Sequence, residues 1–366
     1  TGGGTGGGAG IAVPSVTVAA ANTVDRNSKL RFAGLDRQQA IWVIQDLFLP
    51  RNIDAQSRAF TSYGATLFQQ ISAVDCPKYR GRSHTWADAF YITDGEGDGD
   101  LVWNDFDARS GGLALGGCFD IDADSQWGLM AHFGETTVVH SIPGRFESDN
   151  YGAGLYFIEE NDNNRVTGSM IYSRHDGTNE RDHSVNGFVA TPSIGERDAW
   201  SVAIGLGIEG IDPEEPEKEW RPFAMATFNY VDQDAFSERG FPAYTLDFSS
   251  RATWWMQAET GVRWVRRFES EDEESDPWEL GIAGVVTWLT NLSDEDQAFT
   301  YNWGSTLAIP HRGDSEFGGA LRVSFANRPE ESDRTRYAVH LDAGYSSGLV
   351  TSGVVLNVTI PLGEKN

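Results

Sequence analysis

The sequence predicts an all-β protein: a 12-stranded antiparallel transmembrane β-barrel with an N-terminal α-helical plug through the lumen. Three observations support this prediction. From about residue 84 onward, apolar and polar residues alternate over segments of ten or more residues. There are twelve such segments, and a closed single-chain barrel needs an even number. The chain also holds 41 Gly and 12 Trp although its mean hydropathy is −0.38, as expected when half of each strand faces water and aromatic residues girdle a lipid band.

The composition argues against several other classes of protein. The chain carries 54 acidic and 28 basic residues, for a net charge of −26. Nucleic acid is therefore not an expected partner, because a phosphate backbone is bound by clustered Lys and Arg. No run approaches the roughly 20 apolar residues of a membrane-spanning helix. The chain opens at Thr1 with a Gly-rich run and not with a signal peptide, which indicates a processed or excised piece.

Three regions are expected along the chain. Residues 1–35 begin with a low-complexity run and should form a Gly-rich tether. Residues 36–80 should form a helical linker, in which a first short apolar helix ends at Pro50. The following stretch, 54–75, is rich in Ala, Gln and Ser and predicts a second helix whose small residues suit a confined space. Residues 84–362 should form the barrel.

The barrel segments show period-two alternation, which is what one wet face and one lipid face demand. The last segment is the clearest, since Asn357 and Thr359 lie opposite an apolar face made of Val354, Leu356, Val358, Ile360 and Leu362. The segments are expected to begin near residues 84, 109, 125, 148, 164, 197, 219, 251, 278, 315, 335 and 351.

The connections between the segments alternate in length. The short acidic ones are 122–124, 159–164, 212–219, 269–276 and 328–333. The longer ones are 94–108, 176–194, 232–249 and 291–314. Outer-membrane barrels have short periplasmic turns and longer external loops. We therefore expect a location in a bacterial outer membrane, with the long loops facing the cell exterior.

A soluble β-sandwich or a lipocalin-like barrel would also alternate. Strands of soluble proteins average about 5 to 6 residues, whereas several segments here keep their period for ten or more. The outward face from Trp254 to Trp264 also carries no charge, while Glu259 and Arg263 lie on the other face. Both features favour a lipid-facing wall.

The order of a helix, a short linker and twelve alternating strands resembles the β-domain of type V autotransporters. The phrases that carry the resemblance are RSGGLALGGCFDI, WGLMAHFG, YGAGLYF, RPFAMATFNYVDQDAFSERG and AETGVRWVRRF. The phrase SYGATLFQQI, before the first strand, resembles the pore-threading helix of that family. The match covers about residues 55–362. It implies an outer-membrane translocator that secretes or displays an N-terminal passenger, with residues 1–35 including a passenger remnant.

The resemblance also implies partners and an assembly signal. In this family the last strand carries a signal for the barrel-assembly machinery, and the residues that fit it are Thr351, Gly353, Leu356 and Val358. The chain departs from the family pattern because it continues through Pro361 to GEKN and does not end on an aromatic residue. Any amphipathic last strand with one Gly would also fit. The other implied partners are the chain's own passenger, outer-membrane lipid and lipopolysaccharide. No cofactor, metal or catalytic residue is implied.

Two further sets of residues are candidates within such a barrel. Wall residues expected to face the lumen and to contact the plug or water are Glu259, Arg263, Glu316 and Arg322; a hydrated lumen explains them equally well. Cys118 falls on the inward face close to a short turn, and Cys76 ends the predicted plug helix at the same rim. A disulfide between them would fasten the plug to the wall, although the sequence leaves the bond open.

Two catalytic or ligand-binding hypotheses are weaker. Residues 94–100 alternate carboxylates with Gly like a cation loop, but the twelve-residue calcium frame is missing, so a solvated loop is expected. His175 with Asp176, and His183 with Asp182, are expected at or near the outer rim, where an acid–base pair could act on water, yet no third orienting group is identifiable. We therefore expect no enzyme. The alternative function is a non-secreting outer-membrane barrel, either a narrow porin or a surface binder.

Overall fold

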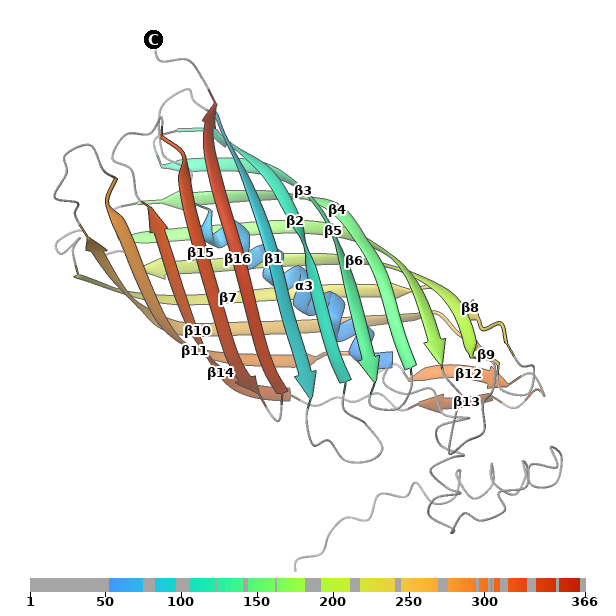
Figure 1. Cartoon of the computed structure of the whole chain (residues 1–366). Coiled ribbons are helices and arrows are strands. Elements are labelled where there is room, and N and C mark those ends of the chain that lie inside the picture. Colours follow the sequence, from blue (N-terminus) through green and yellow to red (C-terminus); the bar gives the residue numbers. More distant parts are fainter. Residues whose placement is uncertain are drawn as a thin grey trace, which may run out of the picture.

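The protein forms a closed barrel around one helix (Figure 1). The structure, a computed structural model, describes residues 53–74, 83–96, 106–122, 124–140, 144–161, 163–181, 192–210, 218–240, 245–268, 276–293, 296–301, 304, 306–309, 315–327, 334–346 and 349–362. The wall consists of β1 (Ser83–Glu96), β2 (Phe106–Asp120), β3 (Ser125–His140), β4 (Gly144–Glu160), β5 (Asn164–Arg181), β6 (Ser193–Gly210), β7 (Lys218–Gln233), β10 (Arg251–Phe268), β11 (Trp278–Asn291), β14 (Ser315–Asn327), β15 (Arg336–Ser346) and β16 (Leu349–Leu362).

All neighbouring strands of the wall pair antiparallel, in the order β1-β16-β15-β14-β11-β10-β7-β6-β5-β4-β3-β2. The first and last strands pair along their full length, from Ser83 opposite Leu362 to Glu96 opposite Leu349. The closed wall therefore leaves no unpaired strand edge, which a hydrocarbon environment would penalise. The prediction of a 12-stranded barrel is confirmed.

The two faces of the wall differ in the way that the alternation predicts. In β4, buried and exposed residues alternate along nearly the whole strand. Outward side chains are large, apolar and uncovered: Leu115 is 50% exposed and Phe133 is 52% exposed. Soluble monomers rarely expose contiguous apolar surface on this scale. The outer face is thus suited to lipid.

Aromatic side chains mark both borders of this apolar band. Trp254 lies outward on β10 opposite Tyr230 of β7, with ring centroids 4.6 Å apart. Trp264 lies farther along β10, opposite Trp220. Ten residues separate the two Trp residues of β10, or about 33 Å of strand, and a tilt of about 45° reduces this to about 23 Å of height. That height matches the roughly 25 Å apolar band of outer-membrane barrels.

One end of the barrel, here called the turn end, carries the short connections after β2 and β4. Asp122 Oδ1 accepts hydrogen bonds from the backbone N–H groups of Asp124 (2.9 Å) and Ser125 (2.8 Å). Asn161 closes the turn after β4 in the same way. The acidic and amide residues of these turns therefore have a local role, because their side chains replace the backbone partners of a tight turn.

Among the described residues, no helix combines the length and apolar character needed to cross a bilayer.

The opposite end, here called the sheet end, carries a second sheet that the sequence did not predict. Its strands, in the order β13-β12-β9-β8, are β8 (Phe236–Ser237), β9 (Leu246–Phe248), β12 (Gln297–Tyr301) and β13 (Thr306–Ile309). Figure 1 shows them gathered away from the C-terminus. They occupy much of the expected loops 232–249 and 291–314. The expected loop 176–194 is also shorter, because β5 continues to Arg181 and β6 starts at Ser193.

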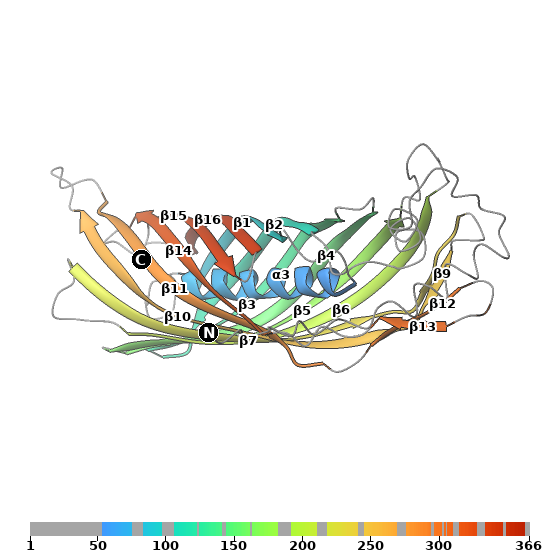
Figure 2. The ribbon, with the colours of Figure 1, turned by 90° about the horizontal axis from the view of Figure 1, so that it is seen from below.

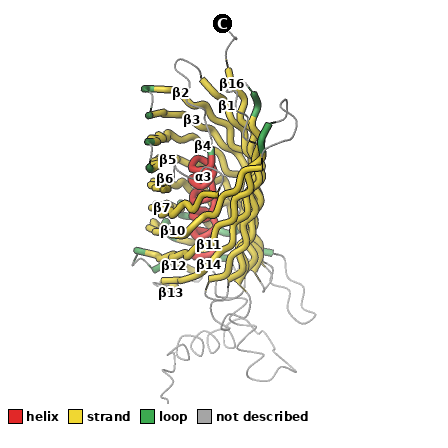
Figure 3. Tube along the Cα trace, turned by 90° about the vertical axis from the view of Figure 1, so that its left-hand side faces the viewer, coloured by secondary structure: helices red, strands yellow, loops and turns green. Residues whose placement is uncertain are grey.

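The lumen holds α3 (Ile53–Ala73), which lies within the ring of strands in Figures 2 and 3. The sequence predicted this helix over 54–75. Its C-terminal end lies at the turn end, where the Arg165 guanidinium donates a hydrogen bond to the backbone oxygen of Val74. A cation at this position satisfies a carbonyl that the helix leaves free. The helix expected before Pro50 and the tether 1–35 fall outside the described residues.

Candidate functional site

The helix in the lumen has one apolar face, and that face is sealed against the wall. The spacing of three and four residues places a stripe on one side of the helix. The side chains of this stripe, each at most 1% exposed, are Phe60, Tyr63, Leu67, Ile71 and Val74. They pack mainly against β2–β7. Burying a large apolar side chain contributes about 1.5–3 kcal/mol, so this stripe anchors the helix off-centre, on one half of the wall.

Two glycines let the helix approach the wall closely. A Cβ at Gly64 of α3 would lie 2.8 Å from Asn229 Oδ1 and 3.1 Å from the Ala203 Cβ. A Cβ at Gly205 of β6 would lie 2.3 Å from the ring of Phe68. Real Cβ atoms do not occur at such distances, so neither position accepts a side chain unless the helix or its neighbours move.

Histidines of the wall complete this contact. His175 is fully buried, its ring stacks on Phe60 with centroids 3.9 Å apart, and it lies 2.7 Å from Asn150 Oδ1 and 2.8 Å from Ser201 Oγ. The hypothesis that His175 and Asp176 form an acid–base pair is therefore wrong, and Asp182 and His183 lie outside the described residues. Consecutive strand residues point to opposite faces, so His175 faces the lumen and Asp176 faces outward.

The opposite face of α3 is polar and carries ion pairs. The Arg58 guanidinium donates from Nε to Asp94 Oδ2 (3.1 Å) and from Nη1 to Glu316. Lower on the same face, Gln69 Nε2 donates to Glu259 Oε1 (3.0 Å). Asp94 was expected in a solvated loop, but it belongs to β1 and is only 6% exposed. Glu259 and Glu316, expected to face the lumen, both do so and both contact the helix.

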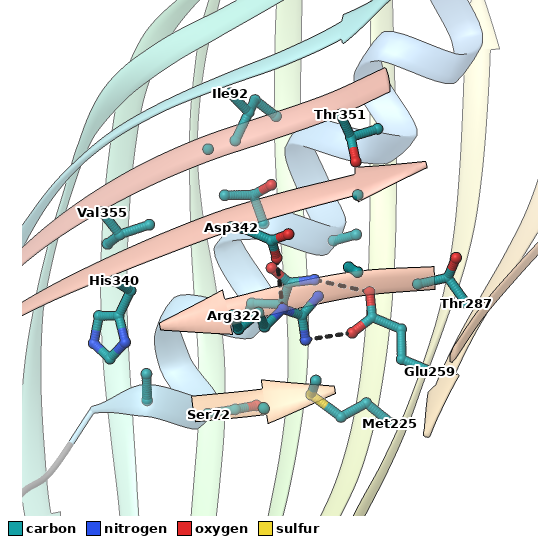
Figure 4. A pocket seen from close by; sticks show the side chains of 18 of the residues that line it. Ser72, Ile92, Met225, Glu259, Thr287, Arg322, His340, Asp342, Thr351 and Val355 are labelled. Carbon is teal, nitrogen blue, oxygen red and sulfur yellow. Dashed lines mark hydrogen bonds and ion pairs between the residues drawn. The ribbon is translucent and has the colours of Figure 1, made fainter. Parts of the chain in front are cut away.

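The two expected arginines of the wall bind other wall residues. Arg322 donates to Glu259 Oε2 (2.7 Å) and to Asp342 Oδ2 (2.5 Å), as Figure 4 shows. Arg263 donates to Glu209 Oε1 (2.9 Å). Of these carboxylates Glu259 is buried, at 5% exposed, and its pairing with Arg322 offsets the cost of burying a charge. In the part of the chain that the structure describes, no three His, Cys, Asp or Glu side chains are placed to hold a metal ion.

A cavity of about 240 Å³ lies beside the polar face of α3 (Figure 4). Its far wall comes from β11, β14, β15, β16 and β1, and many of its lining residues there are small. These small residues include Gly281, Ala283, Ala320, Gly344 and Gly353. The helix-packing strands instead carry bulky side chains such as Met130, Tyr156 and Ile171, and Trp86 and Phe90 of the adjoining β1 extend this cluster. The lumen is therefore asymmetric by sequence.

At the sheet end, the first turn of α3 is tied to the second sheet. Arg197 of β6 is 2% exposed and donates to Gln56 of α3 (3.2 Å), to Gln233 of β7 (3.2 Å) and to Gln297 of β12 (3.3 Å). This cluster was missed from the sequence, since Arg197 and Gln297 belong to segments a hundred residues apart. Only the inward position of Arg197 on its strand offered a signal.

Near the turn end, Cys118 faces inward, as expected. It is 1% exposed and its Sγ lies 3.2 Å from the Tyr156 hydroxyl, which also accepts from Trp86 Nε1 (2.7 Å). The sequence holds one other cysteine, Cys76, the expected partner of Cys118. Cys76 lies outside the described residues, so the pairing stays a prediction.

The residues of the expected assembly signal all lie on β16 and divide between its faces. Thr351 and Gly353 line the cavity. Leu356 is 50% exposed on the outer face, and Val358 shares that face by its position in the strand. The expected signal therefore draws residues from both faces of β16. Its recognition by the barrel-assembly machinery stays a prediction.

The closed wall, the lipid-suited outer face and the helix in the lumen define a membrane-spanning β-barrel plugged by its own chain. The sequence profile described as the autotransporter beta-domain matches residues 85–347, well over half of the chain. The chain belongs to this family and is an outer-membrane translocator barrel.

Solved structures agree with this assignment at the level of the fold. The translocator domain of the autotransporter NalP from Neisseria meningitidis has a TM-score of 0.63 at 11% identity, covering 84% of this chain and 97% of that one. The beta domain of the Bordetella autotransporter BrkA has a TM-score of 0.51 at 10% identity, covering 76% of this chain and 98% of that one. No curated protein sequence matches the chain.

Proposed function

We propose that this barrel exports the polypeptide that precedes it and that α3 is the segment left in the lumen when export has ended. The observation that supports this is the placement of α3 within a closed wall. Its first residue, Ile53, lies toward the sheet end and its last, Ala73, toward the turn end. A closed wall has no lateral exit, so a passenger attached before Ile53 reaches the sheet-end side of the membrane through the lumen.

The proposed orientation places the sheet end at the cell exterior. Export then runs from the periplasm, where the C-terminal strand ends and the short turns lie, to the surface. The two connections that carry extra strands lie at the outer end, consistent with the length asymmetry of outer-membrane barrels. Lipopolysaccharide is the proposed outer-leaflet neighbour, and the barrel-assembly machinery is the proposed partner of β16 (Leu349–Leu362).

Within this proposal the chain divides at the helix. Residues 1–35 are a Gly-rich tether with a remnant of the passenger, residues 36–80 are the linker and plug, and residues 84–362 are the translocator. A Cys76–Cys118 bond would fasten the lower end of the plug to β2. Glu259 and Glu316 hold the plug's polar face, while Arg263 and Arg322 keep the wall neutral.

The proposed role is transport without catalysis. The arrangement of Ser201, His175 and Asn150 has nucleophile–base–orienter distances, but the ring of Phe60 covers the imidazole and Ser201 is only 6% exposed. A substrate carbonyl has no approach to the hydroxyl in this state. A non-secreting porin or surface binder is not favoured, because α3 occupies the lumen and the family is one of translocators.

Surface display of a reporter tests the proposal. An epitope placed before Thr1, with an export signal ahead of it, should become accessible to antibody and to external protease on intact Gram-negative cells. The matched control carries Leu206→Arg, which places a charge on the lipid face and should lower display in proportion to the fall in inserted barrel. An epitope that stays inside the cell while the unsubstituted barrel is folded in the outer membrane would contradict the proposal.

A further inference from the structure

The cavity beside α3 extends along most of the helix. On the helix it is lined from Arg58, near the sheet end, to Ala73, at the turn end. These residues are 15 positions apart, which corresponds to about 22 Å of helix axis. The facing wall contributes polar side chains, among them Thr287, Arg322 and Thr351 (Figure 4). We call this space the side passage.

The arginines at the two ends of the side passage differ in exposure, although Glu259 at mid-height is itself only 5% exposed. Arg263, at the turn end, is 33% exposed, and Asp342, at mid-height, is 29% exposed. Arg58 is only 9% exposed. The passage is thus solvated from the turn end and closed near Arg58.

Arg58 is placed to make that closure. Its guanidinium binds Asp94 of β1 and Glu316 of β14, and both carboxylates are nearly buried, at 8% and 13% exposed. In the wall, β15 and β16 separate β1 from β14. The side chain therefore spans from the helix to two strands that flank the far wall, across the sheet end of the side passage. Ser62 adds a hydrogen bond to Asp94 (3.4 Å).

We infer that the side passage is a path for water and small ions beside the plug, and that the ion pairs of Arg58 with Asp94 and Glu316 restrict it at the sheet end. The inference depends on the closed wall and on the position of α3 against one half of that wall. It does not require that the barrel export a passenger. Its failure and the failure of the proposed function are therefore distinguishable.

Removing either side of these ion pairs should give the opened path a definite preference for cations or for anions. Without the guanidinium, Asp94 and Glu316 become two unpaired carboxylates at the narrow end of the path, and rings of carboxylates select cations. Without the two carboxylates, the Arg58 cation remains alone and favours anions. Substituting Arg58 and substituting the two carboxylates should thus open the same path with opposite ion preference. Displacement of the whole helix would not produce this opposite preference.

Planar-bilayer conductance of the purified chain in KCl tests the inference. The unsubstituted barrel should conduct weakly. Arg58→Met should raise the conductance several-fold with a K⁺/Cl⁻ permeability ratio above unity, and the double variant Asp94→Asn with Glu316→Gln should raise it with a ratio below unity. Arg109→Met is the matched control, since Arg109 lies outward and pairs with Asp107; its conductance should equal that of the unsubstituted barrel.

Displacement of the whole helix is the competing explanation for a rise in conductance. A variant lacking residues 1–80 gives the conductance of a barrel without the helix. All variants are first checked for a heat-modifiable folded band. Conductance of Arg58→Met at the level of the unsubstituted barrel would overturn the inference. So would a rise to the level of the helix-deleted barrel, or the same ion preference in the Arg58 variant and the carboxylate variant.

Discussion

A single charge in the middle of the apolar band provides a direct test of the lipid-facing wall. Leu206 of β6 is 54% exposed and faces outward. It pairs with Ala226 of β7, which lies six residues after Trp220 and four before Tyr230. With about 3.3 Å per residue and a tilt of about 45°, these intervals are about 14 Å and 9 Å of height. Leu206 therefore lies near the centre of the bilayer.

The expected cost of Leu206→Arg follows from this depth. An Arg at the midplane on the lipid face of a barrel costs about 2–4 kcal/mol, and near the interface about 0–1 kcal/mol. The first figure corresponds to about a 30- to 1,000-fold fall in the ratio of folded to unfolded protein. Ile194→Arg is the matched control, because Ile194 lies outward on the same strand, is 44% exposed, and stands six residues beyond Trp200, outside the band.

The assay is reversible guanidinium unfolding in lipid vesicles, followed by the mobility difference between unboiled folded and unfolded bands. Leu206→Arg should lower the free energy of unfolding by about 2–4 kcal/mol, and Ile194→Arg by less than about 1 kcal/mol. Equal costs for the two variants, or a cost under about 1 kcal/mol at Leu206, would refute the placement of this face in hydrocarbon.

Three further predictions concern the lumen. Gly205→Val would place side-chain atoms against the Phe68 ring and should displace the helix, so bilayer conductance should rise to that of the helix-deleted barrel; unchanged conductance would contradict this. Arg322→Met leaves Glu259 without its cation and should lower the free energy of unfolding by about 3–5 kcal/mol, with Arg322→Lys costing less; chemical unfolding measures both. Tyr156→Phe removes a hydroxyl that bridges three neighbours and should cost about 1–3 kcal/mol in the same assay, and an unfolding midpoint equal to that of the unsubstituted barrel would count against the bridge.

Alternation in polarity predicted the strands well where one face meets lipid. The expected starts at 251, 278 and 315 agree with β10, β11 and β14. The starts at 148 and 197 are four residues late, because β4 and β6 begin at Gly144 and Ser193. In the first residues of these two strands Glu147 and Glu196 point outward and interrupt the apolar outer face. Beyond the apolar band both faces are wet, so the periodic signal disappears while the hydrogen-bonded strand continues.

The sequence predicted which side chains face the lumen, but it did not predict which of them form ion pairs. Strand position alone placed Glu259 and Arg322 inward, and the structure agrees. Their ion pair joins β10 to β14 across 63 residues of sequence, and no local pattern carries such a contact. Asp94 was misplaced for the opposite reason. Its Gly- and Asp-rich surroundings suggest a solvated loop, whereas its partner Arg58 lies on the helix and becomes visible only once the barrel is closed.

The second sheet escaped prediction because its strands are short. β8 has two residues and β9 has three, too few for a period to register. Their stability comes from cross-strand packing, in which Phe236 stacks on Phe248 at 4.4 Å between centroids. That contact joins two strands whose proximity depends on β7 and β10 being neighbours in the wall.

Flotation of the refolded chain with lipid vesicles tests whether the outward side chains contact hydrocarbon, a contact that insertion of the barrel and export through its lumen both require. The chain should float with the vesicles, resist extraction by alkaline carbonate, and run as a heat-modifiable folded band when the lipid fraction is left unboiled. A folded, compact monomer that remains in buffer without lipid or detergent would contradict the account.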